Sequence, residues 1–128
     1  MTENEGTVYL VQNPPPVRRT SGPPIFKDLS SAQRYGVLHP MLDEGEQPSA
    51  TPGPCLHKVS KALRQFNPER DFLCYAGGDP MSLAIGCLAL ANMGIKEFNL
   101  LRWERERSTD GQRQRGGFYV PVNVQTRL

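Results

Sequence analysis

Residues 71–104, DFLCYAGGDPMSLAIGCLALANMGIKEFNLLRWE, decide the fold of this chain. The apolar run at 71–77 is typical of a strand that is buried on both faces. An apolar segment that ends at Gly94 predicts a helix, and residues 96–104 predict the next strand. Because tight connections join the first strand, the helix and the second strand, we expect the two strands to be parallel.

Weaker patterns lie on the N-terminal side of this unit. They predict, in order, a strand, a short helix, an edge strand and an amphipathic helix at residues 7–13, 28–36, 37–42 and 54–66. Either Asp28 or Ser30 is expected to cap the short helix, because both side chains accept hydrogen bonds from backbone N–H groups. Residues 43–54 show no apolar periodicity and predict an exposed loop.

The C-terminal segment alternates between two kinds of side chain, as a strand with one buried face does. We expect that face to carry Phe118, Val120, Val122 and Val124. Pro121 favours an edge position, because proline cannot donate to a neighbouring strand. Asp110-Gly111 predicts the hairpin turn that joins this strand to residues 96–104.

These patterns predict one α/β domain over residues 1–128, with a small mixed sheet, about three helices and a C-terminal β-hairpin. Glycine and proline occur 12 times each among 128 residues, so much of the chain is expected to be turn or irregular structure. Residues 1–54 are expected to form a Pro-rich, loosely packed half. Residues 55–128 are expected to form the helix, strand, helix and hairpin core.

Composition places the chain in a broad class of protein. With 38% hydrophobic and 22% charged residues it is globular, and a net charge of +2 is too small to predict nucleic-acid binding by itself. Three cysteines without CxxC spacing favour a reducing compartment. The acidic start MTENEGTVYL lacks a leader pattern, and the apolar run 81–93 is too short to cross a bilayer. We therefore expect an intracellular protein without membrane association.

The glycine turn before the helix is the first candidate site. Gly77 and Gly78 end a strand and lead into a helix N-terminus, where unpaired N–H groups favour anions. A nucleotide or small anion would contact Gly77, Gly78, Asp79 and Ser82. However, neither GxGxxG nor GxxxxGK[ST] occurs, and Asp79 followed by Pro80 is typical of a structural N-cap. Structural capping is the favoured interpretation, with a ligand or a metal at Asp79 as the alternatives.

The helix itself is apolar all round, with Ser82 and Asn92 as its polar side chains. Such a helix is normally covered on more than one side. A chain of 128 residues has few elements to provide that cover, so we expect a homodimer as one way to supply it.

The arginine-rich hairpin is the second candidate site. Neither histidine has a neighbour that marks it as a catalytic base, and no HExxH, GxSxG or zinc-ligand spacing occurs. Basic and aromatic residues on a β-ribbon instead predict a surface for a protein partner or for nucleic acid, with a purely solvated hairpin as the alternative. That surface comprises Arg102, Trp103, Arg105, Arg107, Arg113, Arg115 and Tyr119.

Several of these motifs together resemble small uncharacterised proteins of tailed bacteriophages. The similarity lies in Gly78-Asp79-Pro80, the alanine-rich helix, LLRWER at 100–105 and the closing FYVPV strand at 118–122. Residues 43–54 and the long hairpin depart from the shorter members of that group. The resemblance implies a phage protein that acts in the host cytoplasm, and it implies no activity or catalytic residue.

We therefore expect a non-enzymatic phage accessory protein that binds a host or phage protein, without a cofactor or a metal site. Nucleic-acid association through the hairpin remains open. The alternative is a nucleotide or small-anion binding protein, or an enzyme that acts on such a ligand, using the turn at Gly77, Gly78 and Asp79.

Overall fold

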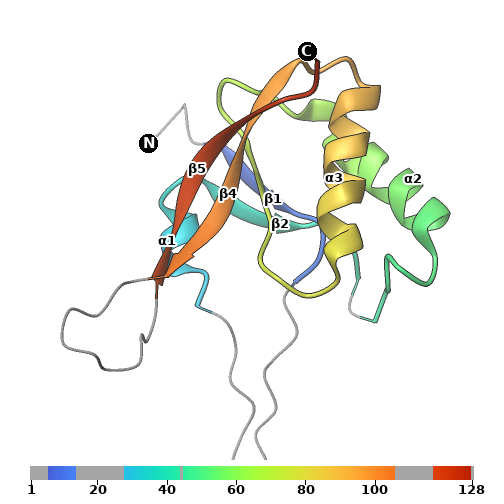
Figure 1. The fold of residues 1–128 in the computed structure, drawn as a ribbon, viewed down its shortest axis with the longest axis horizontal. Coiled ribbons are helices and arrows are strands. Elements are labelled where there is room, and N and C mark those ends of the chain that lie inside the picture. The colour runs from blue at the N-terminus through green and yellow to red at the C-terminus, as the bar shows by residue number, and fades with distance from the viewer. Residues whose placement is uncertain (1–5, 14–27, 44, 106–116, 128) are drawn as a thin grey trace, which may run out of the picture.

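The computed structural model describes residues 6–13, 28–43, 45–105 and 117–127 (Figure 1). The strands are β1 (Thr7–Leu10), β2 (Val37–Pro40), β3 (Phe72–Cys74), β4 (Glu97–Arg105) and β5 (Gly117–Gln125). The helices are α1 (Ser30–Gln33), α2 (Pro52–Ala62) with the 3-10 turn η1 (Leu63–Gln65), and α3 (Pro80–Asn92). The predicted hairpin turn at Asp110-Gly111 lies outside the described residues.

The five strands form one mixed sheet in the order β2-β1-β3-β4-β5. Strands β2, β1, β3 and β4 are parallel to one another, and β5 runs antiparallel to β4. This confirms the predicted mixed α/β sheet, the parallel pairing of β3 with β4, and the edge positions of β2 and β5. The Pro-rich half supplies β1, which lies inside the sheet with Val8 and Leu10 fully buried.

Helices cover both faces of the sheet (Figure 1). One core gathers Val59 and Leu63 from the α2–η1 segment, Ile85 from α3, and Leu73 and Phe98 from the sheet. The second core lies on the opposite face, where α1 packs. It contains Val8, Leu10, Ala32, Cys74, Leu101 and Tyr119. Because neighbouring residues of β3 enter different cores, this short strand is buried on both faces as predicted.

Helix α3 packs closely on the centre of the sheet. A Cβ atom added at Gly86 would lie 3.0 Å from side-chain carbons of both Leu73 and Val11. The absence of a side chain at Gly86 therefore lets α3 approach β3 and the end of β1. Consequently, α3 lies over the middle strands and not over β5.

The burial of β5 differs from the prediction. Phe118 and Val122 are 42% and 37% exposed, whereas Tyr119 is 1% exposed. Val120 and Val124 of the predicted face are half-buried, and on the other face Tyr119 is buried while Pro121 and Asn123 are exposed. On the Tyr119 face, α1 covers the strand, and the Tyr119 N–H donates to the Ser31 hydroxyl at 2.9 Å. On the other face, Val124 packs partly on the core beneath α2 and α3, whereas Phe118 and Val122 lie beyond α3 and stay accessible.

The helix boundaries follow local signals. Helix α2 begins at Pro52, two residues before the predicted start at Pro54. Proline is tolerated in the first turn because its missing N–H would have no intrahelical partner there. Helix α1 is shorter than predicted, and Asp28 accepts the Ser30 N–H at 2.9 Å just before it begins.

Candidate functional site

The glycine turn after β3 has the conformation that its sequence requires. Gly77 and Gly78 have φ values of 93° and 84°, a region that residues with a Cβ rarely adopt. The Tyr75 hydroxyl donates to the Gly78 carbonyl at 3.3 Å, and this hydrogen bond stabilises the turn. Asp79 then caps α3, because its carboxylate accepts the Met81 N–H at 3.0 Å. The predicted N-cap is confirmed.

The turn also lies at the point where the strand order reverses. The chain passes from β1 outward to β2 and then returns to β3 on the other side of β1. Open α/β sheets bind ligands at this place, outside the carboxyl ends of the two strands. Gly77, Gly78 and Asp79 follow β3 directly, so the structure brings these predicted residues to the edge where such ligands bind.

At this edge of the sheet, the loop before α2 also contacts Asp79 through Ser49. The Asp79 carboxylate accepts the Ser49 N–H at 2.7 Å and the Ser49 hydroxyl at 2.5 Å. Hydrogen bonds from Ser49 and from the Met81 N–H hold the pKa of Asp79 below its ordinary value. Ser82 is 3% exposed, and its N–H donates to the Asp79 carbonyl at 2.9 Å. An anion at this helix end would have to displace a carboxylate that already accepts three hydrogen bonds, two from Ser49 and one from the Met81 N–H.

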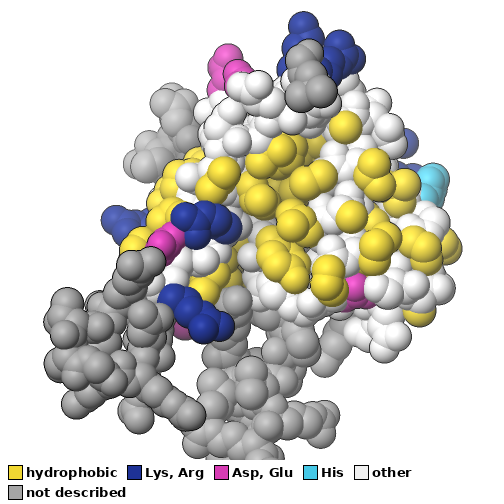
Figure 2. All heavy atoms as spheres, in the orientation of Figure 1, with side chains coloured by type: hydrophobic (Ala, Val, Ile, Leu, Met, Phe, Trp, Pro, Cys, Tyr) yellow, Lys and Arg dark blue, Asp and Glu magenta, His cyan; other side chains and the backbone are white. Residues whose placement is uncertain are grey.

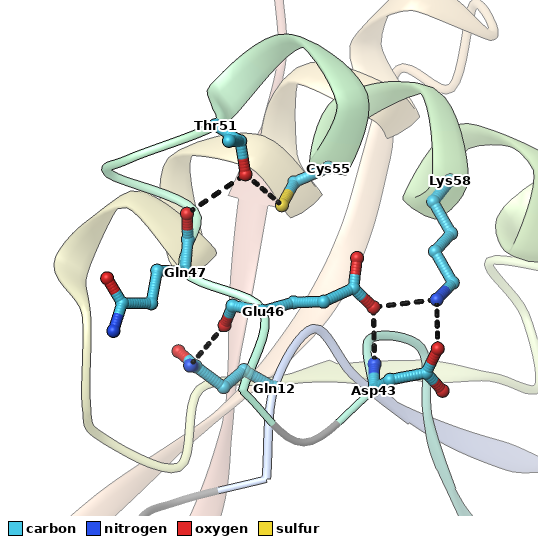
Figure 3. A network of polar contacts seen from close by, with 7 residues as sticks. All are labelled: Gln12, Asp43, Glu46, Gln47, Thr51, Cys55 and Lys58. Carbon is cyan, nitrogen blue, oxygen red and sulfur yellow. Dashed lines mark hydrogen bonds and ion pairs between the residues drawn. The ribbon is translucent and has the colours of Figure 1, made fainter.

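The loop that carries Ser49 is held by polar contacts (Figure 3). The Lys58 ammonium of α2 lies 2.6 Å from carboxylate oxygens of both Asp43 and Glu46. The Lys58 hydrogen bond is the largest cause of the lowered pKa of Glu46. On the other side, the Gln12 side chain donates to the Glu46 carbonyl at 3.3 Å. Asp43, Glu46 and Ser49 thus tie the described part of this loop to α2, to the end of β1 and to α3.

The Asp79 carboxylate and its hydrogen bonds from Met81 and Ser49 form a contact that we call the latch, and replacing Asp79 with alanine tests it. We expect Asp79→Ala to lower Tm by a few degrees at neutral pH, because the variant loses the helix cap and both Ser49 contacts. The folded pKa of Asp79 is lowered, so its stabilisation is present above the unfolded pKa of about 3.9 and is lost as the pH falls through the lower folded value. The difference in Tm between the two proteins should therefore shrink below about pH 4.

Ser49→Ala provides the matched control for this experiment, because it removes the hydroxyl contact and keeps the Ser49 N–H and the cap. It should lower Tm by less than Asp79→Ala does. Equal Tm values for wild type and Asp79→Ala at neutral pH would contradict a stabilising role for the latch.

The structure describes only part of the predicted hairpin surface. Arg105 is exposed, and the Arg102 guanidinium lies 2.5 Å from the Glu104 carboxylate, which offsets its charge. Trp103 is half-buried and packs edge-on against Tyr119, with ring centroids 5.0 Å apart. Tyr119 is buried, so it belongs to the core and not to the predicted surface. The other predicted members, Arg107, Arg113 and Arg115, lie outside the described residues.

An apolar surface that the sequence did not identify as a site spans α3 and β5. We define the apolar face as Ala84, Leu88 and Ala91 of α3 with Phe118 and Val122 of β5, all of which are exposed. Leu88 is 50% exposed. Figure 2 shows hydrophobic side chains gathered across this side of the molecule. The all-round apolar pattern of α3 was the available signal, but its continuation onto β5 depends on the exposure of the valine face.

Within the part of the chain that the structure describes, no group of three or more His, Cys, Asp or Glu side chains is arranged to hold a metal ion. None of the helices described is long and apolar enough to cross a membrane.

The strand order and the helices on both faces define a small doubly wound α/β protein with one open apolar face. A family model described as Phage Pam3 gp32-like protein matches residues 6–125. The chain belongs to this family of phage proteins, which confirms the phage resemblance drawn from its motifs. No curated protein and no solved structure gave a match.

Proposed function

We propose that this protein is a non-enzymatic phage accessory protein that acts in the host cell by binding another protein, of host or phage origin, through the apolar face. The observation that carries the proposal is the exposure of Leu88, Phe118 and Val122 on one side of the molecule. Large contiguous apolar patches on soluble proteins mark interaction surfaces, because leaving them in water is unfavourable.

The outer sides of the two long helices, α2 and α3, differ in polarity. Helix α2 places His57, Lys61 and the partly buried Lys58 on its outer side, as a helix beside water normally does. Helix α3 has no charged residue between its cap and its last residue, and its exposed residues are Pro80, Ala84, Leu88, Ala91 and Asn92. An exposed helix side without charged residues is typical of a surface that another chain covers.

The alternatives have weaker support. A nucleotide or small anion at Gly77 and Gly78 would compete with Asp79 and its contacts to Ser49. A nucleic acid on the hairpin would meet Arg102 already paired with Glu104. Both remain predictions, and salt-dependent binding of mixed-sequence DNA to the purified protein tests the second.

The experiment is capture on the tagged full chain in phage-infected cells, followed by measurement with purified components. Each captured protein is identified, purified and titrated against wild type and Leu88→Glu. We expect binding to the wild type and at least about a 30-fold loss for Leu88→Glu, because the charge would enter an apolar interface.

Gln33→Glu is the matched control. It adds the same charge at an exposed helical position on α1, across the sheet from the apolar face. It should leave binding unchanged. Binding that Leu88→Glu and Gln33→Glu affect equally would refute an interface on α3.

A further inference from the structure

We infer that the occupant of the apolar face is a second copy of this chain, which forms a two-fold symmetric dimer. This inference rests on the proposed function and names the partner. It starts from the incomplete helical layer over the sheet. On the side of α3, the described residues provide α2 and α3 for a five-stranded sheet, and the apolar side chains of β5 remain exposed.

A second copy has the shape that this side of the sheet requires. Each copy presents a raised helix, α3, beside a strip of sheet on which Phe118 and Val122 of β5 are exposed and Phe98 of β4 is buried. When two copies face each other about a two-fold axis, α3 of each lies over the strip of the other. A helix about 10–12 Å across fills one layer on a sheet, so each α3 completes the layer of its partner. The same patch serves both copies, as a two-fold interface requires.

The side chains match this arrangement. The small Ala84 and Ala91 lie one turn before and about one turn after Leu88, so the helix can approach the partner's strip closely. Leu88 would then pack on Val122 of the other copy. The partly buried Cys87, Leu100 and Val124 pack on the same core and continue the apolar surface between helix and strand.

The charges on the apolar face also allow two identical copies to pack together through it. Strand alternation places Arg102 and Glu104 on the same face of β4 as Phe98 and Leu100. These two side chains are paired with each other, so that end of the face has no net charge. A second copy therefore brings no like-charge repulsion, and its own pair can exchange partners across the axis.

The degree of apolarity favours a permanent partner over a transient one. Interfaces of obligate dimers resemble a core cut in half, whereas transient interfaces are about as polar as the remaining surface. The outer side of α3 is of the first kind. Dimerisation by strand addition at β5 is disfavoured, because Pro121 in the middle of that edge strand has no N–H to donate.

Sedimentation of the full chain over a range of concentrations tests the inference. The wild type should have twice the mass of one chain. Leu88→Glu should raise the dissociation constant at least about 100-fold, because the substitution enters a two-fold interface twice. Gln33→Glu should remain dimeric. Val122→Glu, on the strand side of the face, repeats the test if Leu88→Glu does not fold, as judged by circular dichroism.

A cross-link tests the geometry. In a Cys87→Ser background, Leu88→Cys with Val122→Cys should form a covalent dimer on oxidation. Leu88→Cys with Gln33→Cys should not, because Gln33 lies on the opposite side of the sheet.

The outcomes separate this inference from the proposed function. A single-chain mass at every concentration overturns the dimer, and so does a dimer that survives both Leu88→Glu and Val122→Glu. If the protein is monomeric and a different purified protein binds in a Leu88-dependent manner, the proposed function stands and the inference fails. If neither a second copy nor another protein binds through Leu88, both fail.

Discussion

Replacing Asp71 with alanine is expected to lower the free energy of unfolding by about 2 to 4 kcal/mol. The Asp71 side chain is fully buried beside the start of β3. Its carboxylate accepts the Thr7 N–H at 2.9 Å and the Asn67 N–H at 2.8 Å, and the Arg70 guanidinium lies 3.2 Å away. Alanine would leave two backbone donors without their acceptor, and each such loss costs about 1–3 kcal/mol.

Urea unfolding measures this loss of stability, and two further variants serve as controls. Asp71→Asn keeps an acceptor oxygen but turns an amide N–H toward a donor, so its stability should fall between wild type and Asp71→Ala. Asp43→Ala removes a carboxylate that is 84% exposed and paired with Lys58, and it should have almost no effect. If Asp71→Ala were as stable as Asp43→Ala, Asp71 would not organise the junction of β1 and β3.

Replacing Phe98 with alanine is expected to lower the free energy of unfolding by about 3 to 5 kcal/mol. Phe98 is 1% exposed in the core beneath α2 and α3, and its ring meets Phe66 edge-on at a centroid distance of 6.5 Å. Alanine would remove apolar area from the core and leave a cavity, because packed surroundings collapse only in part. Urea unfolding with an unchanged slope would assign the loss to the native state.

Phe118→Ala makes the same chemical change on the same face of the sheet. Phe118 lies on the neighbouring strand and is 42% exposed. At concentrations where the protein is monomeric, this variant should lose less than about 1 kcal/mol. At concentrations where it is dimeric, the loss should grow, because Phe118 belongs to the apolar face. Equal losses for Phe98→Ala and Phe118→Ala in the monomer would contradict the burial described for β5.

The latch at Asp79 and the junction at Asp71 show which site contacts can be predicted. Asp79 accepts from Met81, two residues away, and an Asp-Pro step before an apolar run indicates that contact. Ser49 lies 30 residues from Asp79, and Thr7 lies 64 residues from Asp71. No local pattern encodes such pairs, because the strand order brings them together.

The sequence by itself determined the elements and the class of fold. The apolar run at 71–77, the capped helix that ends before Gly94 and the alternating C-terminal strand each carry a local signal, since period and capping depend on near neighbours. The phage family was likewise readable from short motifs and was confirmed over residues 6–125.

Only the tertiary structure decided which side chains of β5 are buried. Alternation assigns side chains to two faces, but it cannot say which face a helix covers. The face with Phe118, Val120, Val122 and Val124 was predicted to be buried. Instead, α1 packs over Tyr119 on the other face, and the close approach at Gly86 places α3 over the middle strands. Phe118 and Val122 are therefore exposed on the side of the sheet that carries α3. Burial is a property of what packs on a strand, and the packing partners of β5 lie far from it in sequence.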